Sequence, residues 1–473
     1  NSVPSDTVCF PAKLAHGHIL DLVNKKVDRI FYPLMMAIPT EHKNDKATAV
    51  CPVVQGYGIV VNHSDEPLAR HGVPMDQPIF HWTSPELRRS QTLQFFMNNY
   101  SLPENAIKAA IRAAEQSLVD FREAMQADGR RIIAKAKEEG KFVVVIGGRP
   151  YHNDLLVNHH VASHFTAQGI PVITLESLPG VYEQDLQLNT RMEVYNSFHS
   201  RLISGAMLVA QDPALELVQI VSFGCGHDAT ISDELIRIMR DRSEKELLVL
   251  KLDEGDVRGP LSIRIKSFIE TVRGRRAKDA SKQIAKIPTD LFPAKFTVAD
   301  KKKRTILIPN LSVGFSLLCK RIFEEQGYIT EQLPLADERA FALGKKFVHN
   351  DICFPAQVNI GEALLWLETH PEHSLDNVAF ALAKNCENCR AGQYPTLARK
   401  ALDEAGYSAV PIVTTGKDTK AMHPGFEANL DFRLRIMWGI TFMDAIETMV
   451  RQVRPYEVNL GQTQQVYEYY LNK

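Results

Sequence analysis

The stretch Phe142-Val143-Val144-Val145-Ile146-Gly147-Gly148-Arg149-Pro150-Tyr151-His152 decides the fold of this chain. Its first five residues form an unbroken apolar run, which is typical of a strand that is buried on both faces. Strand and helix patterns alternate after it, and this alternation predicts a parallel, doubly wound sheet. The further strands are predicted at 171–175, 207–210, 218–223 and 247–252, and a helix at 232–242.

Cys225 is the first candidate site residue of this sheet. It lies between Gly224 and Gly226, just after a predicted strand and just before a predicted helix. Ligand sites of doubly wound sheets form at the carboxyl ends of the strands. The sequence therefore places this thiol at a functional edge.

The chain before this sheet reads as a short α/β region followed by a long helix. A helix is predicted at 14–23, after Cys9, and a strand at 27–33; Cys51-Pro52 then opens a loop. Ser101 and Glu104 have the spacing of a capping box. The helix that follows carries an apolar stripe that we assign to core packing, with a break expected at Gly129 and an end at Gly140.

A second α/β unit is predicted after a linker rich in Lys, Arg and Ala. Its strands are expected at 305–309, 378–383 and 410–414, a helix at 313–326, and helical structure over 432–470. The predicted domains are 1–140 (α/β and helical), 141–275 (Rossmann-like), a linker at 276–303, and 304–473 (second α/β domain). We thus expect an α/β protein of stacked flavodoxin-like or Rossmann-like parallel-sheet domains in two pseudo-repeated halves.

Composition narrows the class of protein. A chain of 473 residues with 45% hydrophobic and 23% charged residues is ordinary for a globular protein of two to four units. The net charge of −1 argues against a dominant nucleic-acid or acidic-membrane role. No run of about 18 apolar residues occurs, and no signal peptide, so a cytoplasmic location is expected. The chain also lacks an initiator Met, which suggests a processed or excised piece.

A phrase centred on cysteine occurs twice. It reads Val8-Cys9-Phe10-Pro11-Ala12 near the start and Ile352-Cys353-Phe354-Pro355-Ala356 near the end, with Gly17 and Gly361 each eight residues after the Cys. Proline suits the first turn of a helix, where its missing N–H is not needed. The free N–H groups and the dipole of that turn favour an anion, so a thiol there deprotonates more easily. The repeat predicts two related halves, each of which offers a thiolate to a metal centre.

Six of the seven cysteines lie where a ligand can lie. They divide into Cys9, Cys51 and Cys225 in the first half and Cys353, Cys386 and Cys389 in the second, whereas Cys319 lies in an apolar helix and is assigned to the core. Thiolates select iron–sulfur clusters or zinc, and three thiolates would leave one iron of a 4Fe–4S cube open. Zinc sites usually show two close ligand pairs, and only one Cys-x-x-Cys occurs here. For each single cysteine, a plain buried thiol remains the alternative.

Other polar segments carry weaker signals. The run Asn158-His159-His160 is a set of ligand candidates or an ordinary helix surface or cap. His227 either donates a hydrogen bond to a cluster sulfur or faces water, and 253–255 reads as a turn. No dinucleotide fingerprint, Walker A loop or Gly-x-Ser-x-Gly elbow occurs in the sequence.

Several of these segments together resemble a known family, the iron–sulfur proteins related to the 2-hydroxyacyl-CoA dehydratase subunits. More closely, the chain resembles the acyl-CoA dehydratase activase-related proteins and their double-cubane cluster relatives, over nearly all of its length. The segments that carry the resemblance are Ser5-Asp6-Thr7-Val8-Cys9-Phe10-Pro11-Ala12-Lys13-Leu14, Gly148-Arg149-Pro150-Tyr151-His152, Phe223-Gly224-Cys225-Gly226 with Asp228, Ile263-Arg264, and Cys389-Arg390-Ala391-Gly392-Gln393-Tyr394.

The resemblance implies cysteines that converge between flavodoxin-like domains. It implies one or two 4Fe–4S clusters or an 8Fe–9S double cubane as the cofactor, held by Cys9, Cys51, Cys225, Cys353, Cys386 and Cys389. It also implies a cluster-bearing activator ATPase, as a separate chain or a fused segment, and a strand and helix ahead of the first Cys. The chain departs from the family at Cys386, where Gly is expected, and at His227, where Pro is expected. A third ligand of the second half could also lie beyond Lys473.

The function implied is an iron–sulfur oxidoreductase component that receives ATP-driven low-potential electrons and reduces a small substrate. One alternative is a 2-hydroxyacyl-CoA dehydratase-type component with an acyl-CoA substrate. Another is a non-enzymatic electron relay or zinc-binding protein. A homodimer is an expected assembly, and neither nucleic acid nor membrane is an expected partner.

Overall fold

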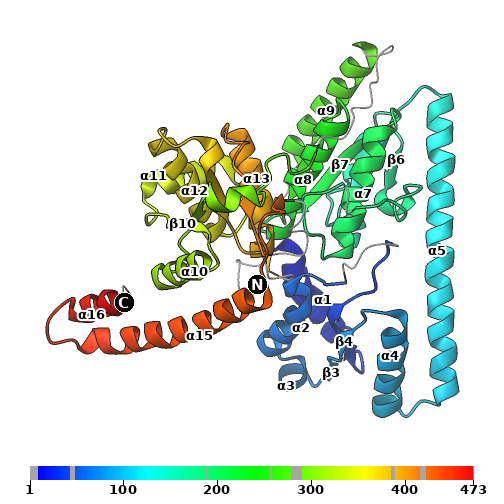
Figure 1. Cartoon of the computed structure of the whole chain (residues 1–473). Coiled ribbons are helices and arrows are strands. Elements are labelled where there is room, and N and C mark those ends of the chain that lie inside the picture. The colour runs from blue at the N-terminus through cyan, green and yellow to red at the C-terminus, as the bar shows by residue number, and fades with distance from the viewer. Residues whose placement is uncertain are drawn as a thin grey trace. The chain divides into compact units, whose positions relative to one another are not determined.

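The computed structural model describes residues 9–42, 48–186, 189–255, 258–278, 290–384, 389–415 and 422–471. The chain divides into two compact units, Asn1–Thr289 and Asp290–Lys473, and the division falls inside the predicted linker. Figure 1 labels the helices and strands of each unit.

The first unit opens with a small α/β part. Two pairs of short parallel strands, β1 with β3 and β2 with β4, lie among helices. The helix α5 then leads from this part to the larger sheet (Figure 1). The elements are α1 (Phe10–Asn24), β1 (Ile30–Phe31), β2 (Leu34–Ala37), α2 (Pro52–Asp65), α3 (Pro67–His71), β3 (Met75–Asp76), β4 (Ile79–His81), α4 (Pro85–Tyr100) and α5 (Glu104–Glu138).

The larger sheet of the first unit has four parallel strands in the order β6-β5-β7-β8. Alternate residues of each strand face opposite layers, so one face packs on α7 and α8 and the other on α6 and α9. The elements are β5 (Val143–Gly147), η1 (Pro150–Asn153), α6 (Val161–Thr166), β6 (Val172–Thr174), η2 (Leu175–Ser177), α7 (Ser197–Gln211), β7 (Leu215–Ser222), α8 (Gly226–Arg242), β8 (Leu248–Leu252) and α9 (Arg258–Lys278).

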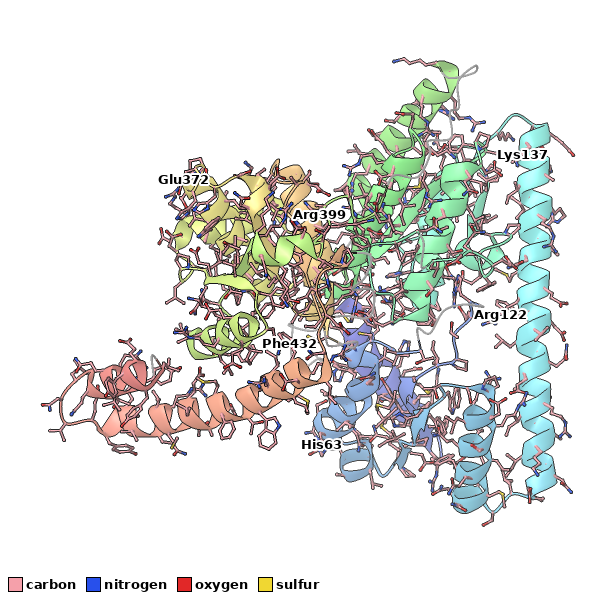
Figure 2. The ribbon with its side chains drawn as sticks, in the orientation of Figure 1. His63, Arg122, Lys137, Glu372, Arg399 and Phe432 are labelled. Atoms are coloured by element: carbon pink, nitrogen blue, oxygen red, sulfur yellow. The ribbon has the colours of Figure 1, made fainter. Side chains whose placement is uncertain are left out.

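The second unit repeats this plan, with four parallel strands in the order β10-β9-β11-β12. The helices α12 and α13 cover one face, and α10 covers the other together with the start of α15 at Phe432 (Figure 2). The elements are η3 (Ala299–Lys302), β9 (Thr305–Ile308), α10 (Val313–Glu325), β10 (Ile329–Gln332), α11 (Glu338–Phe347), α12 (Phe354–Thr369), η4 (Leu375–Asn377), β11 (Val378–Ala381), η5 (Arg390–Gln393), α13 (Tyr394–Glu404), β12 (Ile412–Val413), α15 (Leu430–Val453), η6 (Arg454–Tyr456) and α16 (Gln462–Leu471).

The predicted fold class is confirmed, because the protein has two parallel four-stranded sheets with helices on both faces of each. Numbered in chain order, the strands of both sheets run 2-1-3-4. The order therefore reverses between the first and the third strand of each sheet, and the carboxyl edge beside this switch point is where ligands of doubly wound sheets bind.

Cys51-Pro52 does not open a loop, because Pro52–Asp65 form the helix α2. The apolar stripe of α5 is not core packing over most of its length, because Leu118 and Phe121 are 43% and 55% exposed.

Three further local predictions are wrong. The apolar run 207–210 is not a strand but part of α7, which is buried on nearly every side, so four consecutive apolar residues near its end resemble a buried strand. The helix α5 does not break at Gly129. There the glycine permits close packing, because a Cβ would lie 1.7 Å from the backbone oxygen of Ser177.

The last wrong prediction is the capping box at Ser101. This residue ends α4 in the left-handed conformation, with φ of 51°, and it caps nothing that follows. Instead Pro103 precedes the first residue of α5 and no side chain caps that helix.

In the described parts of the chain, no helix is long and apolar enough to cross a membrane.

Candidate metal centre

All five candidate cysteines within the described residues occupy one kind of position, the residue immediately before a helix. Three of these helices have a proline in the first turn after the cysteine. The proline is Pro52 after Cys51, and the Cys-Phe-Pro-Ala phrase supplies it after Cys9 and after Cys353. None of the five thiols completes a capping hydrogen bond. The pairs are Cys9 with α1, Cys51 with α2, Cys225 with α8, Cys353 with α12, and Cys389 with η5. Cys386 lies outside the described residues.

Cys319 is different, as predicted. It lies inside α10 and packs against the apolar core of the second unit. Burial raises the pKa of its thiol to about 12. This cysteine is therefore a packing residue.

The Cys9 thiol of the first unit interacts electrostatically with the thiols of Cys51 and Cys225. Burial raises the pKa of the Cys9 thiol, and the neighbouring Cys51 thiol raises it further. Burial also raises the pKa of the Cys225 thiol to about 12, with a smaller contribution from Cys9. Cys9 thus lies near Cys51 and near Cys225, although the three are far apart in the sequence.

The helix starts act on these thiols in the opposite direction. The N–H of Ala12 lowers the pKa of Cys9, and that of Asp228 lowers the pKa of Cys225, although neither N–H completes a capping bond. Burial outweighs them, so both thiols are protonated at neutral pH when no metal is bound. A metal that binds here would displace protons, as is usual for cysteine ligands.

A buried cation, Arg149, lies beside these thiols. It directly follows β5 and Gly148, and its charge lowers the pKa of both Cys9 and Cys225. Its guanidinium forms a salt bridge with Asp228 in the first turn of α8 and lies 3.3 Å from the His199 ring. A buried charge is costly unless it is paired, and the Asp228 carboxylate supplies the pair.

Further hydrogen bonds tie the end of β5 to the end of β7. The backbone N–H of Arg149 donates to His152 over 3.0 Å, and the other ring nitrogen of His152 lies 2.8 Å from Ser222 Oγ. The N–H of Ser222 donates to Asp228 over 3.2 Å. Burial lowers the pKa of His152 to about 4, so this ring is neutral. The network fixes the two strand ends that frame the switch point of the first sheet.

A second contact places the segment before Cys51 at the carboxyl edge of the larger sheet of the first unit. Ala49 forms a parallel bridge with Asn196, the capping residue of α7, and its N–H donates to Tyr195 O over 3.0 Å. The Tyr195 hydroxyl lies 2.7 Å from Nδ1 of His227. The His227 ring is buried, so the reading in which it faces water is wrong.

His159, next to Asn158, connects two loops. The described structure gives His159 and His160 left-handed backbones, with φ of 50° and 57°. The His159 ring lies 2.7 Å from Asp253 O, at the turn after β8. Glu254 of this predicted turn forms a salt bridge of 2.7 Å with Lys13 of α1, four residues after Cys9. These contacts anchor the helix that presents Cys9.

The second unit brings Cys353 close to Tyr394. The sulfur lies 2.9 Å from the tyrosine hydroxyl. Burial raises the pKa of Tyr394, and the hydrogen bond with Cys353 and the charge of Cys389 raise it further. Tyr394 therefore contacts the Cys353 thiol and is influenced by the charge of Cys389. The sequence gives this tyrosine only as the last residue of a motif, without a role.

The described residues contain no group of three or more His, Cys, Asp or Glu side chains close enough to hold one metal ion. In an iron–sulfur cube, by contrast, each thiolate binds its own iron, so the ligands need not meet at one point. The donor set of the first unit fits such a cluster: it offers three soft thiols and a buried guanidinium that offsets negative charge.

The fold and this edge define a class, an α/β protein of two doubly wound units with thiols at helix starts. Comparison with family models adds that residues 1–178 match the CoA enzyme activase uncharacterised domain (DUF2229). The match includes Cys9, Cys51 and Arg149, and it ends before Cys225. No curated protein and no solved structure matches the chain.

Proposed function

We propose that this protein is an iron–sulfur component of a CoA enzyme activase system. In this proposal Cys9, Cys51 and Cys225 hold a cluster in the first unit, and Cys353, Cys389 and Cys386 supply the second set. The match of residues 1–178 supports the link to activase systems. The observation that carries the proposal is that the buried Arg149 acts on the helix-start thiols of Cys9 and Cys225, with Cys51 next to Cys9.

A bound cluster would supply one-electron chemistry at low potential. The chain's own residues then have separate tasks. Arg149 offsets the negative charge of the thiolates, and its salt bridge to Asp228 fixes the first turn of α8, which presents Cys225. The Tyr195–His227 pair holds the neighbouring segment in place. In the second unit, the Tyr394 hydroxyl can donate a hydrogen bond to a Cys353 thiolate.

The proposed electron donor is a cluster-bearing activator ATPase, and the match of residues 1–178 to a CoA enzyme activase domain supports this choice. The proposed product of the reaction is a reduced small substrate, with dehydration of a 2-hydroxyacyl-CoA as the alternative. Both need electrons that a mild donor does not provide.

The test is an anaerobic electron-transfer assay. The purified protein, a cognate activator ATPase, ATP and a strong reductant are combined, and the cluster's visible absorbance and electron paramagnetic resonance signal are followed. We expect reduction only when ATP is hydrolysed, and no ATP turnover by this chain alone. A non-hydrolysable ATP analogue is the control. ATP hydrolysis by the purified chain, or reduction that ignores ATP, contradicts the proposal.

A further inference from the structure

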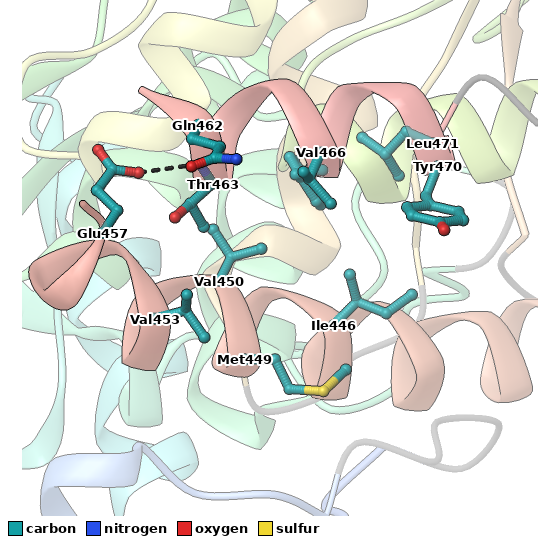
Figure 3. Close-up of a pocket in the computed structure, with 11 residues that line it drawn as sticks. Ile446, Met449, Val450, Val453, Glu457, Gln462, Thr463, Val466, Tyr470 and Leu471 are labelled. Atoms are coloured by element: carbon teal, nitrogen blue, oxygen red, sulfur yellow. Dashed lines mark hydrogen bonds between the residues drawn. The ribbon is translucent and has the colours of Figure 1, made fainter. Parts of the chain in front are cut away.

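Two helix pairs of this protein are held together in different ways. Between α15 and α16 of the second unit, apolar side chains such as Ile446, Val450 and Val466 line a groove of about 590 Å³ (Figure 3). Apolar packing of this kind has no preferred direction. The helices α1 and α2 of the first unit are joined by directional hydrogen bonds, and these two helices begin directly after Cys9 and Cys51.

A histidine of α1 forms these hydrogen bonds. The His16 side chain is fully buried, and its Nδ1 lies 2.8 and 2.9 Å from the two carboxylate oxygens of Asp65. Its Nε2 lies 2.8 Å from the Tyr57 hydroxyl, and the two rings meet edge to face with their centroids 5.5 Å apart. An ionised carboxylate only accepts hydrogen bonds, so Nδ1 carries a hydrogen. In the neutral ring, Nε2 then accepts from the Tyr57 hydroxyl.

Both partners of His16 belong to α2. Tyr57 lies in the second turn of this helix and Asp65 is its last residue, so the imidazole contacts α2 at two points that are eight residues apart. The Ser64 hydroxyl donates to the Asp65 carboxylate over 3.0 Å and helps to orient it. Two contacts at separate points of one helix limit both the sliding and the rotation of α1 against α2.

The start of α2 is itself fixed on the strand β2. The Gln55 side-chain amide donates to Met36 O over 3.1 Å and to Val50 O over 3.3 Å. Met36 belongs to β2, and Val50 directly precedes Cys51. Cys51 therefore has a defined place against β2, and the contacts of His16 relate α1 to it.

His16 is also close to Cys9 along α1. Seven residues separate the two, which is about two turns or roughly 10 Å of helix, so they lie on the same side of α1. The other buried residues of α1 are apolar: Phe10, Ala12 and Ile19. An apolar side chain at position 16 would avoid the cost of taking a polar ring out of water. What the histidine adds is direction, and the ligands of a metal site must be held to within about 0.5 Å.

We propose that His16 is a positioning residue that sets the spacing between the Cys9 and Cys51 thiols through its contacts with Tyr57 and Asp65. The inference rests on the proposed function, in which both thiols are ligands of one cluster. It adds to that function the residue that holds two of the ligands in place before the cluster binds.

The test joins the two thiols chemically in the reduced, metal-free full chain. The reagent is dibromobimane, which becomes fluorescent when it links two neighbouring thiols, and mass spectrometry identifies the linked peptides. Both thiols are partly exposed, so the wild-type chain should give a Cys9–Cys51 product. His16→Leu should lower the yield of this product by about fivefold or more, because the two thiols no longer keep one spacing. Tyr57→Phe and Asp65→Ala each remove one contact and should each lower it by about twofold or more.

Two control variants lie on the same helix. His18→Leu changes an exposed histidine and should leave the yield unchanged. Ile19→Ala removes buried apolar contacts, so it should lower the stability of the chain and still give the product. Circular dichroism checks that each variant is folded.

Three results would overturn the proposal. They are a wild-type chain that gives no Cys9–Cys51 product, a His16→Leu variant that gives as much as His18→Leu, and an equal loss in His16→Leu and Ile19→Ala, which would show a merely structural role. Because no metal is present, the result is separate from the proposed function. A chain with the expected yields that binds zinc without sulfide would refute the cluster and retain the positioning role of His16.

Discussion

The two sheets have the same strand order, and yet the groups at their carboxyl edges differ. In the first unit a buried cation, Arg149, follows the first strand and Cys225 follows the third. In the second unit the first strand leads to Asn310, whose N–H donates to the buried Glu362 carboxylate over 2.9 Å. There the buried cation is Lys384, which follows the third strand ahead of Cys389.

The two copies of the Cys-Phe-Pro-Ala phrase lie at positions that do not correspond in the two units. Cys225 and Cys389 correspond to each other, because both precede the helical segment between the third and fourth strands. The helix after Cys353 connects the second and third strands, and its counterpart in the first unit is α7, which Asn196 caps. Cys9 belongs to the small part that precedes the first large sheet. The bridge from Ala49 to Asn196 brings the segment before Cys51 to the place that corresponds to Cys353.

One strand order can therefore present two unlike sites. The common fold places a helix start at each switch point, and the residues that follow the strands decide the charge there. The first unit presents the thiols of Cys9 and Cys225 beside a guanidinium, whereas the described part of the second presents a tyrosine hydroxyl against the Cys353 thiol.

The largest effect should come from removing single thiols. Cys9→Ser, Cys225→Ser and Cys353→Ser should each lower the iron content by half or more, because a hydroxyl is a poor ligand for soft metal centres. Cys319→Ser is the matched control and should keep its iron, since this thiol packs in the core. Iron and acid-labile sulfide are measured under anaerobic conditions. An essential Cys319 with a dispensable Cys353 would contradict the comparison.

The next largest effect should follow from removing the buried cation of the first unit. Arg149→Met leaves the Asp228 carboxylate buried and unpaired, so we expect a loss of about 3–5 kcal/mol in the free energy of unfolding. Arg149→Met combined with Asp228→Asn should recover part of this loss. Urea denaturation measures it.

Arg273→Met is the control for that experiment, because Arg273 pairs with Glu270 on the exposed surface over 2.7 Å. Its effect should stay below about 1 kcal/mol. If Arg149→Met cost no more than this control, Arg149 would not hold the edge of the first sheet together.

Acid should weaken the first unit more than the second. Burial lowers the pKa of His152 to about 4 and that of His199 well below its usual value, and in the second unit it lowers the pKa of His423 to about 4. The unfolded chain binds these protons near pH 6.5 and the folded chain does not, so stability is full above pH 6.5 and falls as pH decreases toward 4. The expected loss is about 2 kcal/mol per histidine between pH 6.5 and 5.

Hydrogen exchange of peptides from each unit at pH 7 and pH 5 measures this loss separately. His152→Asn should reduce the pH dependence of stability in the first unit. His373→Asn, at an exposed position, should not change the pH dependence of stability. Equal acid sensitivity of both units would go against the expected difference.

The smallest effect concerns the second unit alone. Tyr394→Phe removes the hydrogen bond to Cys353, and we expect it to cost about 1 kcal/mol of stability, the usual net value of one such bond. Tyr456→Phe, at an exposed position of η6, should cost nothing measurable. Thermal unfolding measures both variants. A Tyr394→Phe variant that unfolds at the wild-type temperature would show that this contact does not stabilise the second unit.

The sequence predicts the framework of both units because the relevant signals are local. The apolar run at 142–146, the glycines beside Cys225 and the prolines after Cys9 and Cys353 each act within a few residues, and the strands and helix starts are found there. The strand predicted at 207–210 is wrong because an apolar run in a buried helix has the same local pattern as a buried strand.

The surroundings of the thiols could not be predicted in the same way. The Arg149–Asp228 salt bridge and the Tyr195–His227 contact join residues that are 79 and 32 positions apart, and no spacing rule connects them. Arg149 belongs to the motif Gly148-Arg149-Pro150-Tyr151-His152, but the motif does not indicate that the guanidinium is buried. The helix break predicted at Gly129 is wrong for a related reason, because the packing partner of Gly129, Ser177, is distant in the sequence.

Whether these cysteines hold an iron–sulfur centre is measured by the metal and sulfide content of the anaerobically purified wild-type chain. We expect a brown protein with roughly four to eight irons per chain and a similar amount of acid-labile sulfide. About four irons would indicate one cube, and about eight would indicate two cubes or the joined double cubane. Stoichiometric zinc without sulfide would contradict the claim.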